Sequence, residues 1–310
     1  MERDYNMQGW KYYNHAIVPT CAPHEAPNIS YLEDDTIWTA LQSKEGRIFF
    51  AQWSTEFDCK HETGWWYVIK DTPFDIATLK AKRRYEITKG MKNFDVRRID
   101  CADYKEEMLS VAIAAFNAYP KKYRPHIVKE EFFDSISGWN TENDYVYAAF
   151  HKTEEKMCSY AYLHEEGRYI AFHVLKSIPA FEKQGVNAAM VNYILCDKEE
   201  KLAKGKYICD GQRNVNHETC FPDYLEKYFG FRKAYARLNI KYRPGFDILI
   251  NILFPIRKIL RKFDKNRYFH MANAVLKLEE INRGGNIRSD NINRLTGYYK
   301  ERVMLRFVFG

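Results

Sequence analysis

Residues 168–195 read RYIAFHVLKSIPAFEKQGVNAAMVNYIL and combine a strand, a turn and a helix. Arg168–Leu175 is a run of aromatic and branched residues, the composition of a buried strand. The polar turn over residues 179–187 contains one glycine, Gly185. Beyond it, apolar residues recur at spacings of three and four and predict a helix with one apolar face: Val186, Ala189, Met190, Tyr193 and Ile194.

The glycine turn is a candidate site for an anion. A glycine between a strand and a helix lets backbone amides approach a phosphate, and the helix dipole reinforces the attraction. An ordinary strand-to-helix connection uses the same glycine, and a single glycine does not separate the two interpretations. The candidate cofactor-binding residues are Lys183, Gln184, Gly185, Val186 and Asn187.

The elements around this unit follow a definite order. Upstream, we expect a strand over Val96–Ile99, a helix capped by Asp103, a second helix over Val128–Gly138, and strands over Tyr145–Phe150 and Met157–Leu163, joined by a hairpin turn. Downstream, we expect a strand over Lys206–Asp210, a helix over His217–Phe229 and a strand over Tyr235–Tyr242. Three antiparallel strands therefore precede the glycine turn and its helix.

Two motifs carry a resemblance to a known family. The Gln184-Gly185 turn and its helix resemble the acyl-CoA pyrophosphate loop of the GNAT acyltransferase superfamily, and Leu225–Phe231 resembles its closing helix, which ends in a Gly-Phe pair. Gly185-Val186-Asn187 is closer to the FemAB-like branch, whose founding members transfer amino acids from aminoacyl-tRNA to peptidoglycan precursors. The resemblance covers residues 95–245 clearly and the first ninety only faintly.

The sequence departs from the family pattern at two positions. Asn187 stands where the family loop has a second glycine. Glu226 stands where the family's closing helix often carries a tyrosine that acts as general acid, and Tyr224 and Tyr228 flank that position on other helix faces. The resemblance therefore implies an acid at Glu226 only by position.

The loop over residues 210–219 holds the densest group of reactive side chains. Attack of an amine on a thioester or an ester needs a base and a group that holds the oxyanion. Asp210 and His217 are candidate bases, and Arg213 with Asn214 could hold an anionic substrate. The same residues could instead form turns and begin a helix. His173, in the middle of its strand, is interpreted as a packed core histidine.

A basic segment over residues 78–94 precedes this unit. It is either a solvated helix face or an arm that binds a phosphorylated substrate. In FemAB-like proteins a similar segment borders the substrate groove, so the resemblance implies a substrate-binding role for Arg83 and Arg84.

Composition limits the partners. The net charge of +7 suits an anionic ligand such as CoA, a nucleotide-linked sugar or tRNA, and does not argue for duplex DNA. Seven cysteines lie far apart without a Cys-x-x-Cys pair or zinc-ligand spacing, so no metal is expected. Residues 1–5 lack the apolar core of a signal peptide, and no run approaches the roughly 18 apolar residues of a membrane span. Reduced thiols in the cytoplasm are the simplest account.

The two ends are less informative. Residues 1–30 are polar and proline-rich and are interpreted as an irregular lead-in, followed by a short helix over Ile37–Leu41. Arg47–Trp53 and Gly64–Lys70 read as strands with a polar loop over Ser54–Thr63. Residues 247–263 form a basic amphipathic helix with Pro255 as a kink, which either packs on the domain or lies in a membrane interface. A further helix over 264–283 and a terminal strand over Val303–Phe309 complete the chain.

Together these observations predict an α+β protein with a GNAT-like mixed, mostly antiparallel sheet flanked by helices. We expect a degenerate N-terminal lobe over residues 1–94, an acyltransferase domain over 95–245 and a C-terminal helical extension over 246–310. The resemblance implies transfer of an acetyl or aminoacyl group from a carrier such as acyl-CoA to an amine or hydroxyl, with a cell-envelope precursor as acceptor. An aminoacyl-tRNA donor and a binding protein without catalysis are the alternatives.

Overall fold

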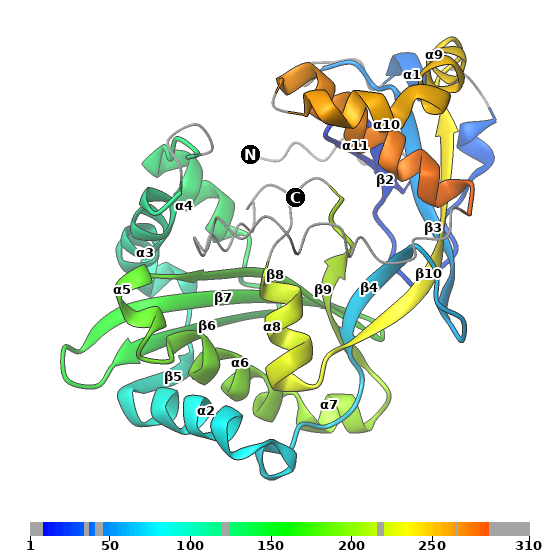
Figure 1. Ribbon diagram of the computed structural model, residues 1–310. Helices are drawn as coiled ribbons and strands as arrows, with labels where there is room; N and C mark the ends of the chain where they lie inside the picture. Colours follow the sequence, from blue (N-terminus) through cyan, green and yellow to red (C-terminus); the bar gives the residue numbers. More distant parts are fainter. Residues whose placement is uncertain are drawn as a thin grey trace.

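The computed structural model describes residues 9–33, 37–40, 46–119, 124–215, 220–264 and 266–284. Its centre is a ten-stranded sheet in the order β1-β2-β3-β10-β4-β9-β8-β7-β6-β5 (Figure 1). The strands are β1 (Trp10–Tyr13), β2 (Ala16–Pro19), β3 (Phe50–Cys59), β4 (Trp65–Lys70), β5 (Phe94–Arg98), β6 (Asp144–His151), β7 (Lys156–Glu166), β8 (Tyr169–Ser177), β9 (Tyr207–Gln212) and β10 (Arg232–Tyr242). All neighbours are antiparallel except β2–β3 and β8–β9. The predicted α+β class, with a mixed and mostly antiparallel sheet, is confirmed.

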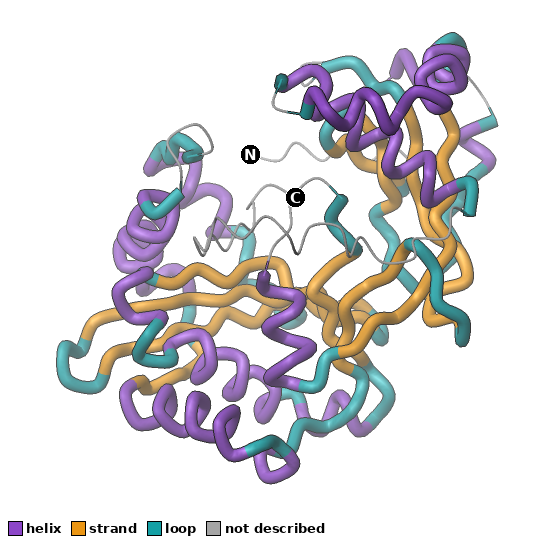
Figure 2. The backbone as a smooth tube through the Cα atoms, viewed as in Figure 1, coloured by secondary structure: helices purple, strands orange, loops and turns teal. Residues whose placement is uncertain are grey.

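Helices cover the sheet unevenly (Figure 2). Among the described residues they are α1 (Ile37–Ala40), α2 (Ala81–Asn93), α3 (Lys105–Asn117), α4 (Lys129–Ser137), α5 (Pro179–Glu182), α6 (Val186–Asp197), α7 (Glu199–Ala203), α8 (Cys220–Phe229), α9 (Phe246–Leu253), α10 (Arg257–Leu260) and α11 (Arg267–Asn282). On one face, α2, α6 and α8 share a core with β5–β9. On the other face, α3 and α4 pack over β6–β8, and α11 packs near β10.

The order of elements from β5 to β10 agrees with the order expected from the sequence. β6, β7 and β8 are three successive antiparallel strands, and β8 is followed by the turn at Gly185 and the long helix α6. α6 is buried along most of its length because it lies between the sheet and α2. The buried strand predicted over Arg168–Leu175 is confirmed as the core of β8.

Three local predictions are wrong. The supposed lead-in over residues 1–30 contains the hairpin β1–β2, since Trp10 and Ile17 are fully buried there and anchor it. The supposed loop over Ser54–Thr63 is largely strand, because β3 continues to Cys59 through pairing with β10. Asp103 does not cap a helix. Asp100 caps a short 3₁₀ turn, and α3 begins after that turn.

One sheet runs through the boundary proposed between the first two lobes. β4, from the proposed N-terminal lobe, lies between β9 and β10 and pairs with both. β3 reaches the rest of the sheet through β10. The sheet therefore contains strands from both sides of residue 94 and does not divide there. The three-domain description stays a prediction.

Glu165 links β7 to β6, to α7 and to the residue that precedes β9. Its carboxylate, on β7, accepts from Lys201 Nζ of α7 at 2.5 Å, from Lys206 Nζ at 2.5 Å and from the Tyr145 hydroxyl of β6 at 2.6 Å. Burial alone would raise the pKa of Glu165, but these three donors outweigh it and hold the pKa at about 2. The two lysines also fix α7 and the start of β9 against the antiparallel strands.

Candidate active site between two parted strands

β8 and β9 pair over only three residues. The parallel ladder joins Tyr169–Ala171 to Tyr207–Cys209 and ends there. Beyond it, β8 stays paired with β7 and β9 stays paired with β4. Among the described residues β8 and β9 do not pair with each other beyond Ala171 and Cys209, so the two strands part at this point.

A β-bulge lies on each strand immediately after the ladder ends. Opposite β7, the register skips His173, because Tyr162 pairs with Val174 and Leu163 pairs with Phe172. Opposite β4, the register skips Asp210, because Val68 and Ile69 pair with Gly211 and Cys209. Bulges bend a strand and redirect the extra side chain, and they are frequent beside active sites. His173 and Asp210 thus mark the point at which the strands separate.

His173 is exposed and stands at the end of a column of rings. Its ring stacks on Tyr162, with centroids 5.4 Å apart and an interplanar angle of 20°. Tyr162 in turn stacks on Trp139 at 4.2 Å and 6°. The interpretation of His173 as a packed core residue is therefore wrong. The bulge interrupts the strand alternation and turns this side chain out of the core.

Asp144 holds the column in place. The Tyr162 hydroxyl donates to its Oδ1 at 2.8 Å, His164 Nδ1 lies 2.7 Å from the same oxygen, and Thr141 donates to Oδ2. Burial alone would raise the pKa of Asp144, but hydrogen bonds from Thr141, His164 and Tyr162 lower it below its usual value. A carboxylate that stays ionised under these conditions fixes the plane of the tyrosine ring on which His173 rests.

The glycine turn before α6 is packed against α2. Gly185 has a φ of +91° and begins the helix, and the amides of Gln184 and Gly185 donate to the carbonyls of Phe181 and Glu182. Lys89 and the side chain of Asn93 donate to the carbonyls of Lys183 and Gln184. These two amides are therefore engaged within the protein. They are therefore not available to a phosphate, whereas a phosphate-binding role of Val186 and Asn187, in the first turn of α6, stays a prediction.

The two glycines of this contact touch each other. A Cβ built on Gly90 of α2 would lie 2.4 Å from the Gly185 carbonyl oxygen and 3.0 Å from the Ala189 nitrogen. From the sequence, Gly185 was interpreted as a residue that lets backbone amides approach an anion. In the structure, Gly185 and Gly90 also allow the backbones of α2 and α6 to come into contact.

We expect Gly90→Ala to destabilise the protein by about 2–3 kcal/mol, because the new methyl group forces α2 and α6 apart. Helix propensity alone would make this change stabilising by up to about 1 kcal/mol. A loss of stability would therefore show that the contact between α2 and α6 outweighs helix propensity. Urea unfolding measures it. Gly138→Ala is the control, since a Cβ there meets nothing closer than 4.0 Å. Equal unfolding midpoints for the two variants would contradict the contact.

Arg213 and Lys233 lie over Trp66, on the face that α8 covers. The Arg213 guanidinium lies 4.4 Å from the Trp66 ring centroid and donates to the Gly64 carbonyl at 2.6 Å, and Lys233 Nζ lies 4.6 Å from the same ring. Burial raises the pKa of Glu226 above its usual value, while Lys233 opposes the rise and Asp223 adds to it. Lys233 thus shares the Trp66 ring with Arg213 and acts electrostatically on Glu226.

The other predicted site residues are spread out. Asn214 follows Arg213 and is exposed. His217 lies outside the described residues. Arg83 and Arg84 are on α2, where Arg83 lies 5.7 Å from the Tyr228 ring centroid and Arg84 donates to the Ala77 carbonyl at 3.1 Å. The Asn187 side chain is buried and accepts from the Ser177 hydroxyl at 2.6 Å. Sequence reasoning missed His173, and only the register between β7 and β8 reveals it.

His173 and Glu226 lie on opposite faces of the sheet. His173 stacks on the side of Tyr162, over which α3 and α4 pack, whereas Glu226 belongs to α8 on the other side. Phe221, at the start of α8, packs on Phe172 with ring centroids 5.9 Å apart, directly beside the bulge.

No protein-family model matches the sequence, and no curated protein matches it significantly. Among solved structures, L-PGS from Bacillus licheniformis matches with 12% identity and a TM-score of 0.46, over 81% of this chain and 85% of that chain. A GCN5-related N-acetyltransferase from Kribbella flavida matches with 16% identity and a TM-score of 0.28, over 37% of this chain and 69% of that chain. A GCN5-related N-acetyltransferase-like protein from Streptococcus suis matches with 17% identity and a TM-score of 0.32, over 58% and 61%. The chain is thus similar, at low identity, to L-PGS and to GCN5-related acetyltransferases.

Proposed function

We propose that this protein is an N- or O-acyltransferase whose reaction takes place where β8 and β9 part. The observation that carries the proposal is the pair of bulges at His173 and Asp210, within two residues of the last paired residues of the two strands. A bulge on each side supplies one side chain that can exchange a proton.

In this proposal the acceptor amine attacks the acyl carbonyl carbon, and its proton passes to His173, directly or through water. Asp210 stands beside the same opening and can orient the acceptor. The bond from the acyl carbon to the donor's sulfur then breaks, and the leaving thiolate takes a proton from Glu226. A carboxyl whose pKa is raised by burial keeps its proton to a higher pH, which suits an acid. His217 stays a second candidate base.

We propose acyl-CoA as the donor. Its phosphates would lie at the first-turn amides of α6, near Val186 and Asn187, with its pantetheine arm between β8 and β9 where the two strands part. Arg213 and Asn214 would contact the anionic part of a substrate. Holding both reactants in line can remove several kcal/mol from a bimolecular barrier. The acceptor is an amine or hydroxyl, which we assign to a cell-envelope precursor handled in the cytoplasm.

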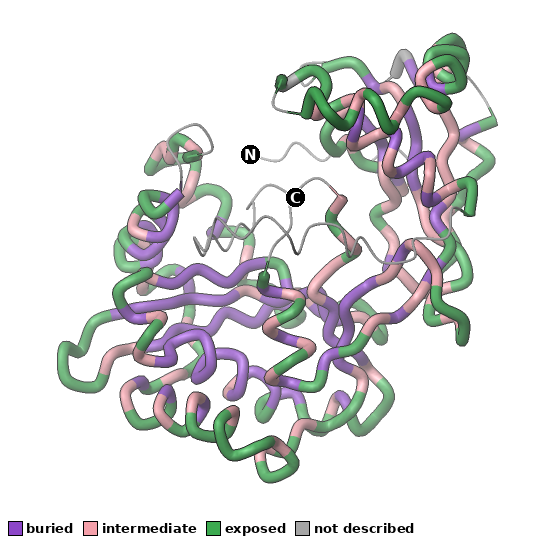
Figure 3. The backbone as a smooth tube through the Cα atoms, in the orientation of Figure 1, coloured by how far each residue is buried: buried purple, intermediate pink, exposed green. Residues whose placement is uncertain are grey.

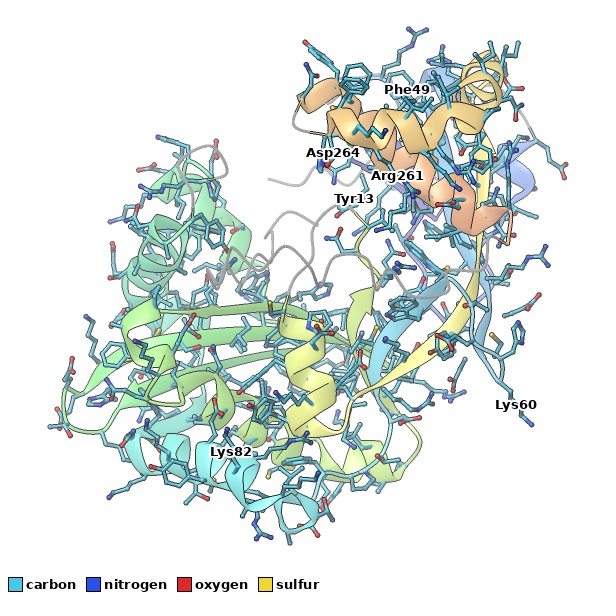
Figure 4. All side chains as sticks on the ribbon, in the orientation of Figure 1. Tyr13, Phe49, Lys60, Lys82, Arg261 and Asp264 are labelled. Atoms are coloured by element: carbon cyan, nitrogen blue, oxygen red, sulfur yellow. The ribbon has the colours of Figure 1, made fainter. Side chains whose placement is uncertain are left out.

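A second donor, aminoacyl-tRNA, is favoured by two observations. The turn at Gly185 is closed by α2, which leaves less backbone available for a pyrophosphate. The outer surface of α2 and of the residue before it is strongly basic, since Lys80, Lys82, Arg84 and Lys92 are exposed. Lys82 is labelled in Figure 4. Such a surface suits the backbone of a nucleic acid, and Arg83 and Arg84 would then contact that carrier.

Thermal stability in the presence of acetyl-CoA, CoA and aminoacyl-tRNA separates these donors. We expect acetyl-CoA and CoA to raise the melting temperature in a saturable way and tRNA to have no effect at physiological salt. A shift with aminoacyl-tRNA alone would transfer the proposal to that donor. If none of the three raises the melting temperature, the acyltransferase proposal is rejected in favour of a binding protein with an acyltransferase-like fold.

A further inference from the structure

The segment that follows β10 presents its apolar side to solvent. α9, α10 and the 3₁₀ turns between and after them run without a break from Phe246 to Phe263. Figures 1 and 3 show this segment along one edge of the molecule, mostly exposed. Six of its large apolar residues are between 43% and 64% exposed: Ile248, Leu249, Ile252, Ile256, Ile259 and Phe263.

Within α9, Ile248, Leu249 and Ile252 share one side, because with about 100° between successive residues they fall within a sector of about 100°. Beyond α9 the exposed apolar residues continue at spacings of three and four: Ile256, Ile259 and Phe263. The apolar side continues at its end, since the rings of Phe263 and of Phe269 in α11 have centroids 5.6 Å apart. We name these six residues and Phe269 the outer apolar face.

The opposite side of the segment is the one that holds it to the protein. Ile250 is buried. Arg257 and Arg261 both donate to Glu280 of α11, and Arg261 is labelled in Figure 4. The Phe254 ring lies under the guanidinium groups of Arg257 and Arg283, at 4.1 and 4.2 Å. A surface helix normally turns its apolar stripe to the core. Here the ion pairs of two arginines with Glu280 hold one side of the segment to α11, and the outer apolar face stays in contact with water.

We propose that the outer apolar face lies in the interface of an anionic membrane. The segment contains four basic residues and one acidic residue, Asp247. Two of the basic residues, Lys258 and Lys262, are exposed, lie one turn apart and border the apolar sector on one side. Aliphatic side chains bordered by lysines are typical of a helix that lies in the headgroup region of a bilayer. Protein interfaces, in contrast, favour aromatic residues and are depleted of lysine.

This contact lies along the surface and does not cross the bilayer. None of the helices in the described part of the chain combines the length and the apolar character that a crossing needs. A single segment of this size, with a modest positive charge, binds reversibly and depends on lipid composition. Binding should therefore weaken as the salt concentration rises and as anionic lipid is removed.

Co-sedimentation of the full chain with vesicles tests the proposal. We expect binding to vesicles that mix phosphatidylcholine with phosphatidylglycerol, and much weaker binding to phosphatidylcholine alone. The double substitution Ile252→Glu with Ile259→Glu should lower the partition constant at least about tenfold, because it places two charges in the apolar sector. Lys258→Glu with Lys262→Glu should remove the preference for anionic lipid.

Ile113→Glu is the matched control. Ile113 is 43% exposed on α3, outside the segment, and its substitution should leave vesicle binding unchanged. Melting temperatures of all variants show whether each is folded. The proposal is overturned if the wild-type chain does not sediment with anionic vesicles, or if Ile252→Glu with Ile259→Glu binds like the wild type. A dimer in light scattering that this double variant dissociates, without vesicle binding, would assign the face to self-association.

Discussion

Glu165→Gln is expected to destabilise the folded protein by about 2–4 kcal/mol at neutral pH. The substitution keeps the shape of the side chain but removes the negative charge that Lys201 and Lys206 share. Breaking a buried ion pair on one side leaves the partner charges uncompensated and costs about 3–5 kcal/mol. The lysine side chains are about one third exposed, at 34% and 32%, so water recovers part of that loss. Urea unfolding measures the difference.

The effect should depend on pH in one direction. The pKa of Glu165 is lowered from 4.5 in its reference state to about 2 in the folded protein, so its contribution is complete above pH 4.5. That contribution is lost as the pH falls from 4.5 towards 2, and the stabilities of wild type and variant should converge there. Glu200→Gln is the control. Its ion pair with Lys204 is 3.6 Å long and highly exposed, so the change should stay below about 1 kcal/mol. A gap between wild type and Glu165→Gln that is constant with pH would refute the assignment.

His173→Ala is expected to reduce the rate of acyl transfer by about 10²–10⁴-fold while donor affinity stays the same. The imidazole takes the acceptor's proton in the proposed reaction, whereas the donor is held by backbone and by other side chains. Release of the CoA thiol from acetyl-CoA, followed over a panel of amines and alcohols, measures the rate. Titration of CoA measures affinity. Imidazole added to the solution should restore part of the lost rate.

His61→Ala serves as the comparison, because His61 is exposed on the connection between β3 and β4. Its rate should equal that of the wild type. Full activity of His173→Ala would remove the histidine from the mechanism and leave Asp210 and His217 as the candidate bases. Loss of donor affinity together with rate, in a folded variant, would make His173 part of the binding site instead.

Much of the fold followed from local pattern. β8 and α6 were predictable because branched and aromatic residues fill the strand and apolar residues recur with helical spacing after Gly185. The second half of β3 was not, since polar residues such as Glu56 and Asp58 suggest a loop. Their positive φ values bend a strand that pairs with β10, which comes far later in the chain. Non-local pairing of this kind leaves no local trace.

The candidate site was less predictable than the fold. Arg213 and Glu226 were both selected from the sequence, but the position of Arg213 over Trp66, beside Lys233, was indicated by no motif. His173 was misjudged because strand alternation assumes a regular ladder, and its bulge exists only through the register with β7. Gly185 was selected as part of an anion site, but its packing against Gly90 was not foreseen, because Gly90 lies in a helix far away in the chain.

The place of β10 in the sheet has a consequence for the order of events on the ribosome. β3 and β4 are consecutive in the chain, yet they do not pair with each other, because β10 lies between them. Their shared partner emerges about 160 residues after β4. At a synthesis rate of about 5–20 residues per second, β10 is completed roughly 8–30 s after β4, and until then β3 and β4 each have an unpaired edge. During that interval Trp53, Trp65 and their neighbours are exposed surface that a chaperone can cover. β10, the last strand of the described residues, then completes the first part of the fold.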